Sequence, residues 1–212
     1  MGEIADGGYI VGIVKKITMN KRAKTNSIRI IAGDWRGRRI PVLDHEGLRP
    51  TTDRVRETVF NWLMYDTNDA NCLDLFAGSG VLGLECLSRK ASFVQFVEKN
   101  KAVASSLSQN LNSLLAGDDS NGRAAVSNSS ALDFLSKPSK GTFDLVFLDP
   151  PFKDGLLPKA VSLLVENNWL SDDALVYLEC DSSDQPFDMP EGWALYKKGK
   201  AGQSAYFLYT TG

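Results

Sequence analysis

The most informative segment of the chain is Leu73-Asp-Leu-Phe-Ala-Gly-Ser-Gly-Val-Leu-Gly-Leu-Glu85. It begins as an apolar strand, turns through glycines and continues as an apolar helix. Gly78, Gly80 and Gly83 have the G-x-G-x-x-G spacing of dinucleotide-binding folds, where glycines permit a tight turn and a close approach of the backbone to a ligand. The stretch therefore predicts an α/β fold with a ligand-binding loop at the end of a strand.

Short apolar strands alternate with longer amphipathic helices around this stretch. We expect strands at residues 72–76, 93–97, 124–126, 143–148 and 174–179, and helices at 53–64, 81–88, 101–115 and 158–167. This alternation predicts a mostly parallel sheet with helices on both faces. Residues 193–197 and 205–209 are expected to close one edge of the sheet as an antiparallel pair, because a short connection suits that geometry.

Acidic residues on both sides of the glycine loop indicate the charge of its ligand. Asp74 precedes the loop, and Glu98 ends the next strand twenty residues after Gly78. Glu98 suits the two hydroxyls of a ribose, which is compatible with NAD. The carboxylate of Asp74 would repel a pyrophosphate and attract an ammonium and a sulfonium, which favours S-adenosylmethionine. The alternative is that the glycines only turn the strand into the helix, with Asp74 as its cap.

A second motif, Asp149-Pro-Pro-Phe152, directly follows the apolar strand 143–148. The carboxyl ends of strands form the ligand crevice of an open α/β sheet, so this motif is expected to face the glycine loop. Pro150 and Pro151 fix the backbone, and the Asp149 carboxylate with the Pro150 carbonyl can accept both hydrogens of an exocyclic amine. Phe152 offers a face on which a flipped base can stack. The alternative is an ordinary proline-rich turn.

Positive charge is concentrated in the N-terminal quarter of the chain. Residues 15–56 contain twelve Lys and Arg against four acids, whereas residues 57–212 contain twelve against twenty. Residues 27–32 and 38–42 alternate as strands around a turn, which predicts a β-hairpin with arginines on one face. Such clustering favours a polyanionic partner. Trp35 lies among the arginines, where it either stacks on bases or packs into the core. The six arginines expected to contact RNA are Arg36, Arg38, Arg39, Arg49, Arg54 and Arg56.

Composition excludes several other classes of protein. The 212 residues, 43% of them hydrophobic and 24% charged, are typical of a soluble globular domain. The three widely spaced cysteines indicate reduced thiols in the cytoplasm. We expect no membrane span, no secretory leader and no metal site. The single histidine, His45, disfavours mechanisms that depend on histidine.

From about Ile28 onward the chain resembles RsmD, a bacterial family that methylates guanine N2 in 16S ribosomal RNA. The resemblance rests on Ile28–Arg39, Leu48–Leu63, the glycine loop, Asp149–Phe152 and Ala201–Tyr206. It implies a Rossmann-like class I methyltransferase fold, S-adenosylmethionine as the methyl donor, and 16S RNA within an assembled or assembling small subunit as the partner. The family's catalytic motif corresponds to Asp149, Pro150, Pro151 and Phe152, and its cofactor contacts to Asp74, Gly78, Gly80 and Glu98.

One position departs from related methyltransferases. Many of them place an acid before Ala-Leu in the segment that meets the adenine, whereas this chain has Ser130 there. A hydroxyl can still form a hydrogen bond with the adenine amine. The complete set of expected cofactor contacts is Asp74, Phe76, Ala77, Gly78, Ser79, Gly80, Glu98, Lys99, Ser130 and Ala131.

The sequence thus predicts three parts and one activity. Residues 1–27 are expected to be a flexible N-terminal segment, 28–47 a basic β-hairpin extension, and 48–212 the methyltransferase domain of a cytoplasmic monomer. The alternatives are an amino-methyltransferase that acts on DNA adenine or on a protein amide, and a non-catalytic RNA-binding assembly factor.

Overall fold

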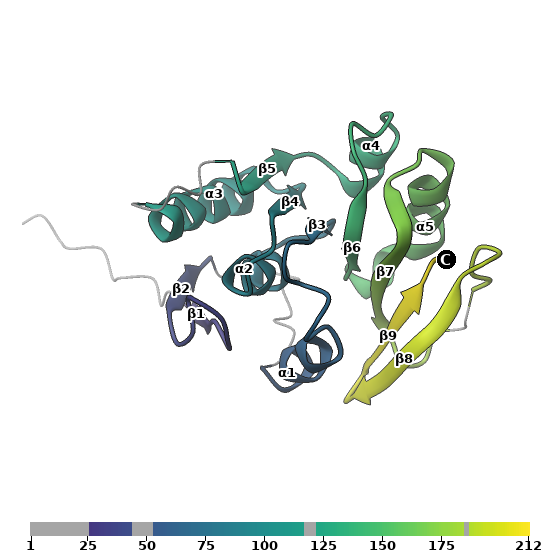
Figure 1. Cartoon of the computed structure of the whole chain (residues 1–212), viewed down its shortest axis with the longest axis horizontal. Helices are drawn as coiled ribbons and strands as arrows, with labels where there is room; N and C mark the ends of the chain where they lie inside the picture. The colour runs from purple at the N-terminus through teal and green to yellow at the C-terminus, as the bar shows by residue number, and fades with distance from the viewer. Residues whose placement is uncertain (1–25, 44–52, 117–121, 185–186) are drawn as a thin grey trace, which may run out of the picture.

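The computed structural model describes residues 26–43, 53–116, 122–184 and 187–212. Within these ranges, seven strands form one sheet in the order β5-β4-β3-β6-β7-β9-β8, and two strands form a separate hairpin (Figure 1). The hairpin strands are β1 (Asn26–Arg29) and β2 (Arg39–Val42). The sheet contains β3 (Asn71–Asp74), β4 (Phe93–Glu98), β5 (Ala124–Asn128), β6 (Phe143–Leu148), β7 (Leu170–Asp181), β8 (Ala194–Ala201) and β9 (Ser204–Thr210). The helices are α1 (Asp53–Trp62), α2 (Val81–Ser88), α3 (Lys101–Leu115), α4 (Ala131–Leu135) and α5 (Leu157–Glu166), with a short 3₁₀ helix at Phe152–Asp154.

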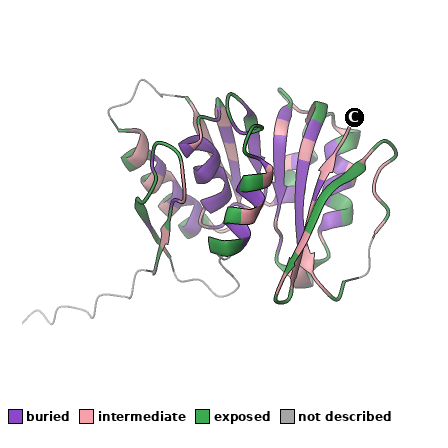
Figure 2. Cartoon of the chain, turned by 60° about the horizontal axis from the view of Figure 1, so that its bottom comes forward, coloured by how far each residue is buried: buried purple, intermediate pink, exposed green. Residues whose placement is uncertain are grey.

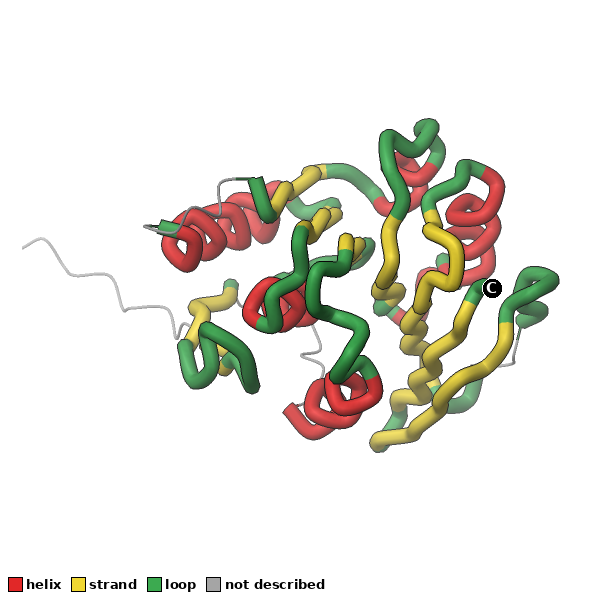
Figure 3. The backbone as a smooth tube through the Cα atoms, in the orientation of Figure 1, coloured by secondary structure: helices red, strands yellow, loops and turns green. Residues whose placement is uncertain are grey.

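Strands β3 to β7 run parallel, and the last two strands run antiparallel to their neighbours. β9 lies between β7 and β8, and Gly202 and Gln203 connect β8 to β9. Figure 3 shows the short connection between these last two strands. The expected antiparallel closure of the sheet is therefore confirmed. The prediction of a mostly parallel sheet with helices on both faces is confirmed as well.

Side chains alternate between two apolar cores, one on each face of the sheet. Cys72 of β3 and Phe147 of β6 belong to the core under α1, α2 and α3. Leu73 and Val146 belong to the core under α4 and α5. Figure 2 shows this arrangement as buried inner surfaces on the helices and strands, with exposed residues along β8 and the hairpin. The two layers of helices leave the ends of the strands as the place where loops can form a site.

The β1-β2 hairpin is packed against α2 and α3. Ile30, Trp35 and Ile40 are buried in the first core. The side chain of Asn110 in α3 donates a hydrogen bond to the Pro41 carbonyl at 3.0 Å. Core packing is therefore the role of Trp35. The predicted flexible segment 1–27 lies outside the described residues except for its last two, and residues 44–47 of the predicted extension also lie outside them.

Most predicted elements agree with the structure, and the differences have physical causes. Helix α3 begins where Asn100 caps it: the Asn100 side chain accepts hydrogen bonds from the backbone N–H groups of Ala102 and Val103. Helix α4 was not predicted, because five residues are too few to show a helical period. β7 begins four residues earlier than expected, at residues too polar to show strand alternation. None of the helices in the described part of the chain has the length and apolar character that a bilayer crossing requires.

Candidate active site

The two sequence motifs leave adjacent parallel strands at the same edge of the sheet. β3 pairs with β6, with Asp74 opposite Phe147, and the Leu75 N–H donates to the Phe147 carbonyl at 3.2 Å. β4 and β5 lie on one side of β3 in the sheet, whereas β6, the next strand in the sequence, lies on the other side. Such a reversal of strand order opens a crevice at the carboxyl ends of the strands. The glycine loop and Asp149–Phe152 therefore leave the sheet side by side, and we call them the two walls of the crevice that this topology predicts.

The backbone of the glycine loop requires glycine at its turns. Gly78 and Gly80 have positive φ values of 51° and 78°. A Cβ on Gly83 would lie 2.3 Å from the ring of Phe96, so this glycine allows α2 to pack closely on β4. These are the mechanical roles expected of the motif. They bring the amino terminus of α2 to the crevice.

Asp74 is buried beneath the loop, with 3% of its surface exposed. Its Oδ2 accepts a hydrogen bond from the Gly83 N–H at 3.1 Å, so the carboxylate caps α2. Burial raises the pKa of Asp74 to about 7; the Gly83 hydrogen bond opposes this shift, and Glu98 adds to it. The capping role that the sequence allowed is thus present. It is compatible with attraction of a cation, because a positive ligand nearby favours the ionised form.

Glu98 is held at the end of β4 by backbone groups of its neighbours. Its Oε2 accepts from the Gly78 N–H at 2.9 Å, and its Oε1 accepts from the Asn100 N–H at 2.6 Å. A carboxylate has about four acceptor sites, so each oxygen retains capacity for a further donor. The half-buried side chain is thereby fixed between the glycine loop and the start of α3.

An ion pair joins the two walls of the crevice. Lys99 Nζ, which follows β4, lies 3.6 Å from Asp154 Oδ2 in the 3₁₀ helix after the second motif. Asp149 and Phe152 are half-buried, Pro150 is buried and Pro151 is exposed. The segment after the motif therefore contacts the residue that follows Glu98 at the end of β4.

The remaining predicted cofactor residues surround the loop. Ser130 caps α4, accepting from the Asp133 N–H at 3.1 Å, and Ala131 is buried beside it. The hydroxyl of Ser130 keeps its own proton and a lone pair for a ligand. Ala77 is buried, whereas Phe76 and Ser79 are half-buried. Ser79 lines a small hollow together with Pro41 and Val42, so the end of the basic hairpin reaches the glycine loop.

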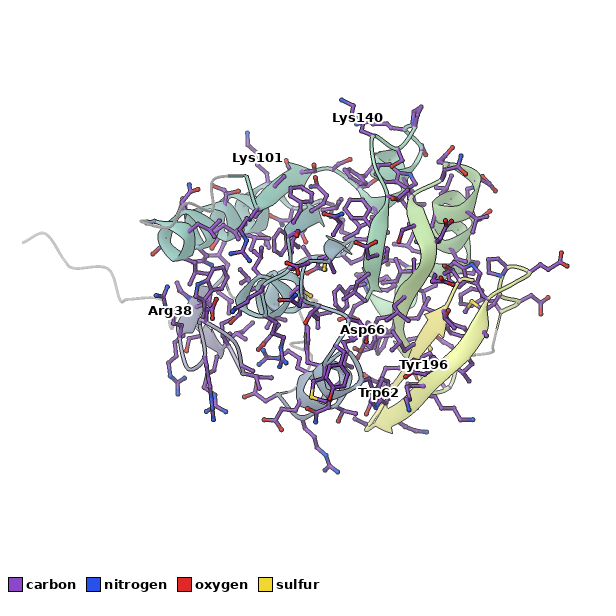
Figure 4. All side chains as sticks on the ribbon, viewed as in Figure 1. Arg38, Trp62, Asp66, Lys101, Lys140 and Tyr196 are labelled. Carbon is purple, nitrogen blue, oxygen red and sulfur yellow. The ribbon has the colours of Figure 1, made fainter. Side chains whose placement is uncertain are left out.

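The arginines expected to contact RNA do not all share one environment. Arg36, Arg38 and Arg39 are exposed on the hairpin, and Arg38 projects from it in Figure 4. Arg54 is exposed in the first turn of α1. Arg49 lies outside the described residues.

The environment of Arg56 differs from the one predicted for an RNA-binding residue. Its side chain is completely buried. Nη1 donates to the Arg29 carbonyl at 3.1 Å and to Glu85 Oε1 at 3.3 Å, and Nη2 donates to Asp53 Oδ1 at 2.5 Å. The prediction that Arg56 contacts RNA is therefore wrong: the residue joins the hairpin, α1 and α2 inside the protein.

Two polar residues beside the crevice were not singled out from the sequence. Tyr177 and Glu179 lie at the carboxyl end of β7, and the Tyr177 hydroxyl donates to Glu179 Oε2 at 2.8 Å. The sequence signal that could have indicated Glu179 is its position at the carboxyl end of a predicted parallel strand. Glu98 and Asp149 also lie at the carboxyl ends of predicted strands.

Several known proteins are similar to this chain over most of its length. A family model described as "Conserved hypothetical protein 95" matches residues 28–210. "Ribosomal RNA small subunit methyltransferase D" of Haemophilus influenzae is 53% identical over 183 residues, covering 86% of this chain and 93% of that protein. The protein of the same name from Escherichia coli K12 is 50% identical over 186 residues, covering 87% of this chain and 90% of that protein. The solved structure "Putative methyltransferase yhhF from Escherichia coli" superimposes with a TM-score of 0.79 at 48% identity, covering 88% of this chain and 98% of that one.

The fold is that of a class I methyltransferase with a Rossmann-like sheet. The chain belongs to the RsmD family, whose members include these small subunit methyltransferases. The resemblance seen in the sequence is thereby confirmed.

Proposed function

We propose that the protein transfers a methyl group from S-adenosylmethionine to the exocyclic N2 of one guanine in 16S ribosomal RNA. One observation carries the proposal: the glycine loop with its two acids and the Asp149–Phe152 motif leave adjacent strands, β3 and β6, where the strand order reverses. The names and identities of the relatives support an rRNA substrate.

The residues of the cofactor wall fit this methyl donor. The positive φ values at Gly78 and Gly80 favour glycine, and a Cβ on Gly80 would lie 2.4 Å from Leu107, so glycine lets the loop turn tightly against α3. Glu98 has acceptor capacity for two ribose hydroxyls, and Asp74 and Glu98 together make the wall acidic toward an ammonium and a sulfonium. When bound, S-adenosylmethionine supplies a methyl carbon activated by the positive sulfur. A dinucleotide would instead place its pyrophosphate against the same acids, which would repel it.

The second wall orients the amine. The lone pair of an exocyclic amine is delocalised into the base, so the amine is a poor nucleophile. The Asp149 carboxylate and the Pro150 carbonyl accept its two hydrogens, which favours a pyramidal nitrogen whose lone pair points at the methyl carbon. Phe152 stacks on the extruded base. Asp149 then holds the proton that the nitrogen releases. Positioning supplies most of the rate enhancement.

The basic hairpin supplies the contacts with RNA phosphates. Arg36, Arg38 and Arg39 are exposed on an element that ends beside the glycine loop. Arg54 extends this surface onto α1, and Arg49 lies in the segment between the two. Structured RNA is recognised through its shape and its splayed-out bases, which suits such a surface. We further propose that the protein acts as a cytoplasmic monomer on the assembled or assembling subunit.

The test is methyl transfer from radiolabelled donor to three acceptors: small subunits from cells that lack this protein, free 16S RNA, and DNA. We expect label in the small subunit RNA, with N2-methylguanine as the product in a nuclease digest analysed by mass spectrometry. Label in DNA alone, or in protein alone, would replace the proposal with the corresponding amino-methyltransferase. Failure to bind the donor at all would favour an assembly factor without catalysis.

A further inference from the structure

Glu179 is a buried carboxylate on the side of the crevice away from the cofactor wall. β6 and β7 are adjacent and parallel, and Leu148 pairs with Leu178 at the end of β6. Asp149 and Glu179 are the next residues on the two strands, so both follow at the carboxyl edge. Glu179 has 5% of its surface exposed. The carboxylate thus lies next to the motif that orients the amine.

The hydroxyl of Tyr177 fixes the orientation of this carboxylate. Tyr177 is fully buried, and its Oη donates to Glu179 Oε2 at 2.8 Å. Burial raises the pKa of Tyr177 well above its ordinary value, and the charges of Glu179 and Asp149 add to the shift. The phenol therefore stays protonated as a donor. The register of β6 and β7 places Asp149 and Glu179 at the same level of the sheet, one residue beyond the pair Leu148 and Leu178.

Within the described residues, no ion pair accounts for the burial of Glu179. The acids that pair with Lys or Arg in this part of the chain are Asp53, Glu85, Asp154 and Glu166. A buried carboxylate without a cationic partner is costly unless it has other donors. Such groups in a crevice are candidates for binding a ligand.

The neighbouring strand gives this wall a rigid backing. Glu179 pairs with Tyr206 of β9, and the ring of Tyr206 lies 5.5 Å from that of Trp62, centroid to centroid. A Cβ on Gly199 of β8 would lie 2.4 Å from the Tyr206 ring, so the glycine leaves room for it. Trp62 of α1 therefore contacts Tyr206, which is the strand partner of Glu179.

We propose that Glu179 selects guanine by accepting the hydrogen on N1 while Asp149 and Pro150 hold the adjacent N2 amine. This inference rests on the proposed function. Guanine presents donors at both N1 and N2, whereas adenine has a lone pair at N1 that a carboxylate repels. Enzymes that extrude a base read it through hydrogen bonds to this edge. Tyr177 is a positioning residue, because it acts through Glu179.

The experiment compares guanine with 2-aminopurine, which keeps the N2 amine but has a lone pair at N1. Small subunits are reconstituted with either base at the position that the wild-type protein methylates, and kcat/KM is measured for each. We expect the wild type to prefer guanine by at least about tenfold. In Glu179→Gln, Tyr177 donates to the amide oxygen and the amide NH₂ faces the base. The variant should therefore lose at least about tenfold on guanine and prefer 2-aminopurine.

Two controls separate base selection from a structural role. Titration calorimetry should give the same affinity for S-adenosylmethionine in the wild type and in Glu179→Gln. Tyr177→Phe keeps the Glu179 carboxylate but removes the hydrogen bond that orients it. The preference of this variant for guanine should therefore fall without inverting. Tyr177→Phe also tests the inference if Glu179→Gln does not fold. Equal losses on both bases, or an unchanged preference, would overturn the inference. If the wild type methylates neither base, the proposed function itself fails.

Discussion

Arg56 Nη1 lies 3.3 Å from Glu85 Oε1, and both side chains are inaccessible to solvent. Glu85 Oε1 also accepts a hydrogen bond from the Ile31 N–H at 2.5 Å, and Arg56 donates to the Arg29 carbonyl. Arg89 pairs with the other oxygen of Glu85 at 3.5 Å. One buried charge cluster therefore joins the β1-β2 hairpin, α1 and α2. The element that bears the exposed arginines is thus fixed to the helix that begins at the glycine loop.

Removing Arg56 should destabilise the whole fold. Arg56→Ala leaves Glu85 buried with fewer partners, and breaking a buried pair costs about 3–5 kcal/mol. We expect a loss of this size in the free energy of unfolding, measured by urea denaturation. Arg54→Ala is the matched control, because Arg54 is exposed on the same helix. It should change stability by less than about 0.5 kcal/mol. Equal effects of the two substitutions would contradict the structural role of Arg56.

The raised pKa of Asp74 predicts a pH dependence with a definite sign. Between its ordinary pKa of 3.8 and the folded value of about 7, the folded state holds a proton that the unfolded state has lost. The contribution of Asp74 to stability therefore falls as pH rises through this window, by up to about 1.4 kcal/mol per pH unit.

Asp74→Asn removes this titration, so it should be more stable than the wild type at pH 8, with the difference shrinking toward pH 4. Cofactor affinity should show the opposite trend in the wild type. A bound cation favours the ionised form of Asp74. The affinity for S-adenosylmethionine should therefore increase from pH 6 to pH 8, and this increase should be smaller in Asp74→Asn than in the wild type. Parallel stability curves for the two proteins would show that Asp74 does not titrate there.

Glu98→Ala should weaken cofactor binding more than it affects catalysis. The substitution removes the acceptors for the Gly78 and Asn100 N–H groups as well as those proposed for the ribose. We expect at least about a tenfold loss of affinity by titration calorimetry, the usual effect of losing hydrogen bonds to a charged group. Turnover should be largely restored at saturating donor. Glu98→Gln retains one acceptor oxygen, so its affinity for the cofactor should lie between those of the wild type and Glu98→Ala. A fully retained affinity in Glu98→Ala would remove Glu98 from the site.

The exposed arginines should act through salt-dependent binding. In the double variant Arg38→Ala/Arg39→Ala, we expect a higher KM for small subunits at unchanged kcat. The slope of log affinity against log salt should fall by about 0.7–0.9 for each phosphate that the variant no longer neutralises. Lys140→Ala is the control, because Lys140 is exposed on a different part of the molecule, as Figure 4 shows. An equal change in both proteins would show that the hairpin is not the RNA surface.

The sequence predicts the sheet and the crevice well because both depend on local patterns. Helix α3 has the predicted bounds, since Asn100 caps it and apolar residues recur at Val103, Leu107 and Leu111. Strand alternation also places the second motif at the same edge of the sheet as the glycine loop. Its position directly beside the loop depends on the pairing of β3 with β6, which is a distant contact.

The errors arise where a tertiary partner decides the environment. Arg56 appears in the sequence as one more arginine in a basic run, and only the packing of α2 against α1 places Glu85 beside it. Glu179 does not stand out in the sequence because the role proposed for it depends on Asp149, which follows the neighbouring strand β6. Trp35 allowed two interpretations, and burial at 6% exposure decides for packing.

The orienting role of Asp149 is tested by comparing Asp149→Ala with Asp144→Ala, the same substitution at the opposite end of β6. We expect Asp149→Ala to lose methyl transfer to small subunits by about a hundredfold or more, because it loses an acceptor that orients the amine. Its affinity for S-adenosylmethionine should stay within about twofold of the wild type, while Asp144→Ala keeps its turnover. Near-normal turnover in Asp149→Ala would contradict the central claim that this carboxylate orients the reacting amine.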